Sequence, residues 1–159
     1  MKPVQPAPDF TRLRNVLTGE AKPNRLPLVE LFIDEPIKEQ ILGRVVASDF
    51  SLDPEEVRQR IDDEIEFRYK LGYDYIDVCP LVYFGTGFQF SPNTERFWMS
   101  ESSSLIHCRK DFEKHQWPTA EDVNYSQMEY AASRLPEGMM IIPRVAGVFE
   151  NVSFLTGIE

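Results

Sequence analysis

Hydrophobic positions in the first part of the chain follow two different patterns, one helical and one extended. Residues 10–17 carry apolar side chains at helical spacing, which predicts a helix. Residues 26–33 form a short apolar run between chain-breaking residues and predict a strand buried on both faces, with Glu30 as its polar exception. Asp34 follows this run, and we expect it to cap a short helix over residues 35–42.

The clearest local pattern lies at residues 53–56. An Asp at the N-cap, a Pro at the first helical position and a Glu at the third match a capping box. We expect a long helix from here to about Leu71, then Gly72, then a strand over residues 73–79 that is rich in aromatic and β-branched side chains. A helix, a glycine and a strand in this order are typical of an α/β unit.

The second half of the chain returns to this order after a long aromatic stretch. Residues 80–108 are rich in aromatic residues, Ser and Gly without a helical period, and a loop of this length is usually functional. Asn124 is expected to cap a helix that runs to Leu135, and residues 139–143 predict a third strand. Alternating strands and helices imply parallel pairing, because each crossover returns the chain in the same direction. At 159 residues the chain falls short of the ~250 typical of a closed (β/α)8 barrel.

Charge and composition disfavour several classes of protein. The chain has 17 Lys and Arg against 26 Asp and Glu, a formal net charge of −9. This acidic balance argues against nucleic acid and anionic membranes as partners, since both usually bind clustered Lys and Arg. No apolar run approaches the ~18 residues that span a bilayer, and residues 1–9 predict an extended, proline-rich tail without the apolar core of a signal peptide. Cys79 and Cys108 are too few for a disulfide framework, so we expect free, buried thiols and a cytoplasmic protein.

Five short segments are informative because they follow one another in a particular order along the chain. They are residues 27–34, 70–77, 111–118, 135–139 and 147–150, of which the Asp-Phe-Glu-Lys…Trp-Pro of 111–118 is the most specific. Together they resemble the N-terminal part of the uroporphyrinogen decarboxylase (URO-D) superfamily, especially the branch similar to corrinoid-dependent methyltransferases. The resemblance implies an α/β fold with the parallel strands of a (β/α)8 TIM barrel. Residues 10–159 would supply roughly the first three β/α units, as the N-terminal portion of a single domain.

The resemblance also implies an enzyme that moves a methyl group between a small methylated substrate and a corrinoid protein. In that branch a zinc ion held by His and Cys supports the transfer. Those ligands would lie beyond Glu159, so we expect this segment alone to hold no metal and no cofactor.

Two alternatives to methyl transfer stay open. Porphyrin decarboxylases of the superfamily carry arginines after their first strand that pair with substrate carboxylates. Residues 32–37 contain no arginine and two acidic residues, so decarboxylation of uroporphyrinogen is the less favoured activity. The other alternative is a non-catalytic barrel fragment that associates through its strand edges, for example as a homodimer.

Polar residues at the ends of the predicted strands are the candidates for catalysis, because the catalytic face of a barrel lies at the carboxyl ends of its strands. Glu30 and Asp77 lie in or at the end of such strands, where a carboxylate could orient a substrate or hold a proton. Both would equally suit a structural salt bridge. Arg144 directly follows the third strand, and it could bind a substrate carboxylate or phosphate or simply neutralise one of these two acids.

The long loop supplies candidate substrate-binding residues of another kind. Tyr83, Phe84 and Trp98 could line an apolar pocket, and they would equally suit a lid or a subunit contact. His107 and Cys108 are adjacent, so their side chains would point to opposite faces of an extended chain. We therefore do not expect them to hold a metal ion together.

Overall fold

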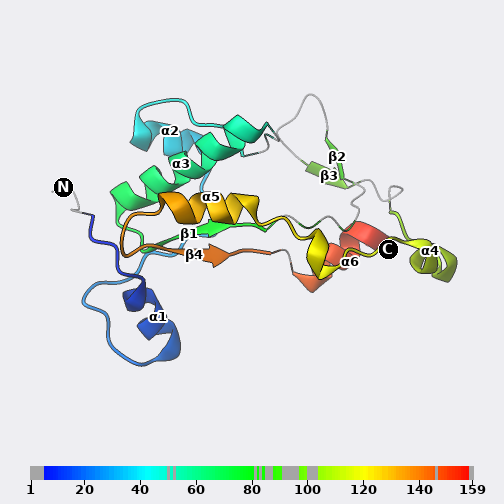
Figure 1. Ribbon diagram of the computed structural model, residues 1–159, viewed down its shortest axis with the longest axis horizontal. Helices are drawn as coiled ribbons and strands as arrows, with labels where there is room; N and C mark the ends of the chain where they lie inside the picture. Colours follow the sequence, from blue (N-terminus) through cyan, green and yellow to red (C-terminus); the bar gives the residue numbers. More distant parts are fainter. Residues whose placement is uncertain are drawn as a thin grey trace. The chain divides into compact units, whose positions relative to one another are not determined.

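The computed structural model describes residues 6–49, 51, 53–80, 82, 84, 88–90, 97–99, 104–145 and 147–157 (Figure 1). The helices are α1 (Phe10–Thr18), α2 (Glu35–Leu42), α3 (Pro54–Leu71), α4 (Arg109–Lys114), α5 (Ser126–Arg134) and α6 (Val148–Thr156), with a 3-10 turn at Ala120–Asp122. The strands are β1 (Tyr75–Val78), β2 (Phe88–Phe90), β3 (Phe97–Met99) and β4 (Met140–Pro143). The chain forms two compact units. The first holds Met1–Cys79 and Tyr125–Arg144, and the second holds Pro80–Asn124 and Val145–Glu159.

The expected (β/α)8 barrel is wrong for the described part of the chain, which is rich in helix. In the first unit β1 pairs with β4 in parallel, in a register from Tyr75 opposite Met140 to Val78 opposite Pro143. In the second unit β2 pairs with β3 in antiparallel fashion. No described strand joins β1 and β4 to widen their sheet. The alternation of helix and strand correctly indicated parallel pairing, but it overestimated the number of strands.

The missing strand is the apolar run at residues 26–33, which is extended but belongs to no sheet. The Tyr75 hydroxyl donates to the carbonyl oxygen of Glu30 at 3.1 Å and accepts from the Glu30 backbone N–H at 3.3 Å. These are the two backbone groups that a neighbouring strand would use. Because a tyrosine side chain separates the run from β1, the run cannot approach to the ~4.8 Å of a ladder. Leu26 and Phe32 remain 81% and 71% exposed, so the expected burial on both faces is also wrong.

Local signals placed the helices well. The Asp53 carboxylate accepts from the backbone N–H groups of Glu55 and Glu56, which confirms the predicted cap of α3. Asp34 occupies the N-cap position of α2, but its side chain makes no capping hydrogen bond. It therefore stands where the sequence predicted a cap without acting as one. At α5 the N-cap residue is Tyr125, one position after the Asn124 that the sequence suggested.

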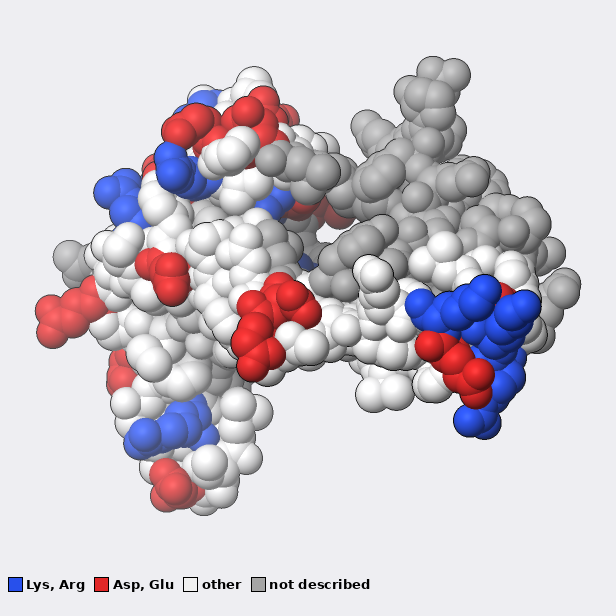
Figure 2. Space-filling model, turned by 45° about the vertical axis from the view of Figure 1, so that its right-hand side comes forward, with Lys and Arg blue, Asp and Glu red and all other residues white. Residues whose placement is uncertain are grey.

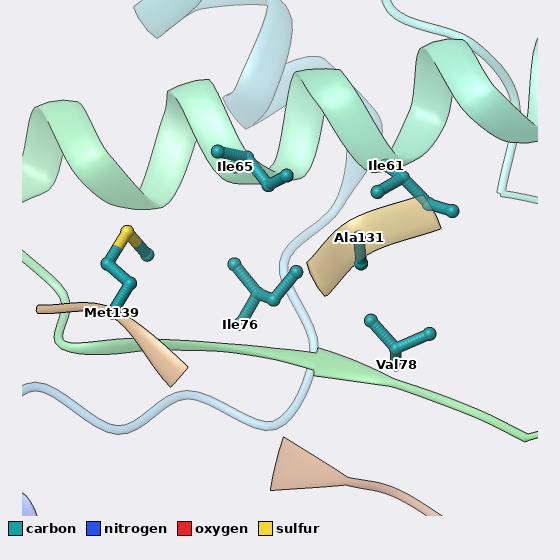
Figure 3. Close-up of a cluster of buried hydrophobic side chains, with 6 residues drawn as sticks. All are labelled: Ile61, Ile65, Ile76, Val78, Ala131 and Met139. Atoms are coloured by element: carbon teal, nitrogen blue, oxygen red, sulfur yellow. The ribbon is translucent and has the colours of Figure 1, made fainter. Parts of the chain in front are cut away.

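The main core lies between the strand pair and two helices (Figure 3). Side chains alternate along β1, so Ile76 and Val78 point toward α3 and α5, while Tyr75 and Asp77 belong to the opposite face. The buried members of this cluster are Ile61, Ile65, Ile76, Val78, Ala131 and Met139. On the other face, Leu13 of α1 packs with the tyrosine rings beside β1 and with Ile33. Both faces of the short sheet are therefore covered in part, which fixes where Asp77 points.

The described start of the chain is held against the first unit. Asp74 is 1% exposed, and its Oδ1 accepts from Arg12 at 2.5 Å, from Arg25 at 3.1 Å and from the Asp9 backbone N–H at 2.9 Å. One residue further, the Phe10 N–H donates to the carbonyl oxygen of Gly138 at 2.9 Å. The predicted tail is thus pinned over its described residues 6–9.

The surface carries both signs of charge. Figure 2 shows acidic and basic side chains interspersed on the visible face, and the basic cluster at the right of the view has acidic side chains beside it. None of the helices in the described ranges combines the length and the apolar character that crossing a membrane would require.

Candidate functional site

The candidate site lies at the carboxyl end of the β1–β4 pair, within the first unit. Asp77 belongs to β1, and Arg144 directly follows β4 with its backbone N–H donating to the carbonyl oxygen of Val78 at 3.1 Å. Because the strands are parallel, both residues come to the same end of the sheet. The Arg144 Nε lies 2.9 Å from Asp77 Oδ2. The structure therefore contains the ion pair that the sequence offered as one alternative for Arg144.

A second arginine approaches Asp77 from helix α3. The Arg68 Nη2 donates to Asp77 Oδ1 at 2.6 Å, and its Nε donates to Glu64 one helical turn earlier. Lys38 of α2 lies 3.1 Å from the other oxygen of Glu64. We call Lys38, Glu64, Arg68, Asp77 and Arg144 the charge row. Its positive and negative side chains alternate from α2 to the carboxyl end of β4.

The charge row is largely removed from water. The Arg68 side chain is 2% exposed, and its guanidinium lies over the rings of Tyr73 and Tyr75 at 5.2 and 4.8 Å. The side chains of Glu64 and Asp77 are 15% and 12% exposed. At such depth an unpaired charge would be very costly, so each member depends on its neighbours.

Burial and pairing shift the pKa values of the two acids in opposite directions. Burial raises the pKa of Asp77 above its usual range, and Arg68 and Arg144 offset this only in part. Burial also acts to raise the pKa of Glu64, but the Arg68 and Lys38 cations outweigh it and hold that pKa below the usual range. Asp77 is therefore the member of the row that takes up a proton more readily.

One buried nitrogen of the row lacks a partner. Arg68 Nη1 makes no hydrogen bond with the described part of the chain, whereas its Nη2 also reaches the Glu30 carbonyl oxygen at 3.5 Å. Buried polar atoms without a partner are uncommon, and the oxygen Oδ2 of Asp74 is another within the described ranges.

Of the three polar residues singled out in the sequence, Asp77 and Arg144 meet here through their side chains, and Glu30 joins them through its backbone. The Glu30 backbone is bound by Arg68 and Tyr75, and its side chain is exposed. Burial raises the pKa of Tyr73, and the charge of Glu30 adds to this, which places the Glu30 carboxylate in electrostatic reach of the row. Their catalytic and binding roles stay predictions.

Sequence reasoning missed Arg68, the residue that joins the others. A usable signal was present, because Arg68 continues the inward stripe of α3 that Ile61 and Ile65 begin. A charged residue on an apolar stripe, with a Glu four positions before it, indicates a buried ion pair.

The structure describes the three aromatic candidates, Tyr83, Phe84 and Trp98, only in part. Tyr83 lies outside the described residues, as does the side chain of Trp98. Phe84 is half-buried, and its carbonyl oxygen lies 2.8 Å from His115 Nε2. The expected aromatic pocket therefore stays a prediction.

A separate hollow of about 530 Å³ lies within the second unit, beside His107 and Cys108. The Cys108 thiol donates to Asp111 at 3.3 Å, and the Ser104 hydroxyl lies 3.1 Å from His107 Nδ1. Cys79 and Cys108 form no disulfide, and both are exposed, so the expected burial of these thiols is wrong.

Compared with models of protein families, with curated proteins and with solved structures, the chain matches none. The physical arrangement of its own residues must therefore carry the functional argument.

The described residues offer no set of ligands for a zinc ion. Across the described ranges, no three His, Cys, Asp or Glu side chains gather closely enough to hold a metal ion. The zinc and the corrinoid that the resemblance implies are therefore assigned no residues of the described ranges.

Proposed function

We propose that the carboxyl end of the β1–β4 pair binds a small methylated substrate and that the chain takes part in methyl transfer to a corrinoid protein. The reaction class comes from the resemblance to the URO-D superfamily. One observation supports the location, namely that Glu30, Asp77 and Arg144, far apart in the sequence, come together around Arg68.

The charge row suggests roles for four of its members. Asp77 pairs with both Arg68 and Arg144 and so holds the Arg144 guanidinium in place, while the substrate oxygen that loses the methyl group takes its proton from water. Arg68 positions Asp77 through its bond to Oδ1, and Glu64 positions Arg68 in turn. Arg144 is half exposed and is the member that can touch a substrate.

Methyl transfer is tested by supplying free cobalamin in its Co(I) state, with zinc, as the acceptor. A panel of small methyl ethers and methylamines is added, and the absorbance of methylcobalamin is followed. We expect D77N to lower the rate at least about tenfold, equivalent to ~1.4 kcal/mol in the barrier. The matched control is R109Q, since Arg109 lies in the second unit with a side chain that is 85% exposed. Circular dichroism separates a loss of activity from a loss of fold.

Two results would contradict the proposal. One is the absence of methylcobalamin across the whole panel, and the other is an equal rate for D77N and the unsubstituted protein. Turnover of uroporphyrinogen in place of the methylated panel would favour decarboxylation instead.

Association through strand edges is a second candidate, and one observation favours it. Among the described strands β1 and β4 pair only with each other, so each leaves an outer edge open. Sedimentation at increasing protein concentration tests this candidate, and a constant monomer mass would contradict it.

A further inference from the structure

Arg144 is fixed on two sides and open on a third. Its Nε pairs with Asp77 at 2.9 Å, and the centre of its guanidinium lies 4.6 Å from the centroid of the Phe32 ring. The carboxylate and the ring together restrict the rotation of the guanidinium plane. Its two terminal nitrogens have no hydrogen-bond partner within the described ranges, and the side chain is 36% exposed. The outer edge of the guanidinium therefore presents two parallel donors in a fixed direction.

The charges next to Arg144 alternate in sign. Asp77 is shared between Arg144 and Arg68, so two cations face one carboxylate at this end of the row. Glu64, the next acid, is shared in the same way between Arg68 and Lys38, and Asp49 lies 3.4 Å from Lys38 at the far end. An anion placed on the outer edge of Arg144 would continue the alternation of signs, whereas a second cation there would be repelled.

The geometry of the donors selects among anions. Two coplanar N–H groups match the two oxygens of a carboxylate, which forms a bidentate pair with arginine. Phe32 lies on the face of the same guanidinium and is 71% exposed, and Leu31 beside it in the sequence is 65% exposed. These side chains offer apolar surface next to the charged edge.

We propose that the ligand of this site is a small carboxylate with an apolar or aromatic body, bound through its carboxylate to the outer edge of Arg144 and through its body to Phe32. This inference rests on the proposed function, since it names the substrate class of the same site. The carboxylate positions the ligand and is not itself altered.

The binding test compares two ligands that differ in charge alone. The probes are 4-methoxybenzoate and the neutral 4-methoxybenzamide, titrated calorimetrically into the full chain. We expect the carboxylate to bind at least about tenfold more tightly, since charge-assisted bidentate pairs contribute more than neutral hydrogen bonds. R144Q should abolish this difference, R144K should restore part of it, and F32A should weaken both probes. R109Q again serves as the control, and circular dichroism shows whether each variant is folded.

The possible outcomes separate this inference from the function on which it rests. If 4-methoxybenzoate binds in a way that depends on Arg144 but no methyl transfer is found, the proposed activity is wrong and the proposed binding site is supported. Equal affinity for both probes, or tight carboxylate binding that survives R144Q, would overturn the inference. Stronger competition by inorganic phosphate than by benzoate would replace the carboxylate with a tetrahedral anion.

Discussion

Gly138 shows what a single residue contributes to the first unit. Its φ is +86°, and a Cβ at this position would lie 2.2 Å from the carbonyl oxygen of Pro8. Its own carbonyl oxygen accepts from the Phe10 N–H. The absence of a side chain therefore allows residues 6–9 to lie against the turn before β4.

Replacement of Gly138 by alanine should detach this segment. We compare it with G43A, because Gly43 also has a positive φ, +71°, and has nothing within 4 Å of the added Cβ. Both variants incur the left-handed strain of about 1 kcal/mol. G138A should lose a further ~1–3 kcal/mol, because backbone must move to admit the methyl group. Urea unfolding measures both, and equal losses would show that the contact with Pro8 is unimportant.

Reasoning from single residues named the site residues near the strand ends, but it did not include Arg68, which joins them. Asp77 and Arg144 could be predicted as neighbours because the ends of parallel strands meet at one edge of a sheet, whereas Glu30 lies in a run that joins no described strand. Arg68 reaches the same place from a helix. Its position on the inward stripe of α3 could be read from the sequence, but its contact with Asp77 depends on how α3 packs against the strands.

At the scale of elements, helix ends were predictable because their signals are local. The cap of α3 needs only residues within one turn, and α3 ends at the Gly72 that the sequence marked. The run at residues 26–33 was misinterpreted because an apolar extended segment becomes a strand only if a partner is available. Here the backbone groups of Glu30 bind the Tyr75 hydroxyl instead of a neighbouring strand.

The two aspartates at helix starts provide a matched test of capping. Asp53 accepts from the N–H groups of Glu55 at 2.9 Å and Glu56 at 3.1 Å, whereas Asp34 makes no such bond. We expect D53A to destabilise the protein by about 1 kcal/mol and D34A to change it little. Thermal unfolding followed by circular dichroism measures both. A larger loss for D34A would show that position alone, without the hydrogen bond, determines the capping effect.

At the scale of the whole molecule, the first unit combines segments that lie far apart in the sequence. Its core needs α3 and β1 from the first half of the chain and α5 and β4 from the second. The barrel was expected from the resemblance to a known superfamily, and the local pattern of helices and strands could not correct it because such a pattern does not specify how many strands meet. The number of strands in a sheet depends on which segments pair in the folded chain, and a local sequence pattern does not specify this.

The charge row connects several of these segments and should make stability depend on pH. The pKa of Glu64 lies below its usual range, so its ionised form stabilises the fold above the ordinary glutamate range. That contribution is lost as the pH falls through the folded-state value. Asp77 acts in the opposite sense, because its raised pKa favours the protonated form in the folded state.

We therefore expect E64Q to be less stable than the unsubstituted protein by about 1–3 kcal/mol near neutral pH, since Arg68 and Lys38 lose a buried charged partner. The difference should shrink as the pH is lowered through and below the glutamate range. Urea midpoints over this interval measure it, with E113Q as the control, because the Glu113 side chain is 59% exposed and pairs only with Arg109 at the surface. A pH-independent difference would assign the loss to packing instead of charge.

The bond from Phe10 to Gly138 joins the earliest described helix to the lead-in of the last strand of its unit. During synthesis on the ribosome, α1 must wait until Gly138 has emerged before this bond can close. Until then Leu13 and the tyrosines that pack with Ile142 of β4 lack that neighbour, and apolar surface left uncovered in this way favours aggregation.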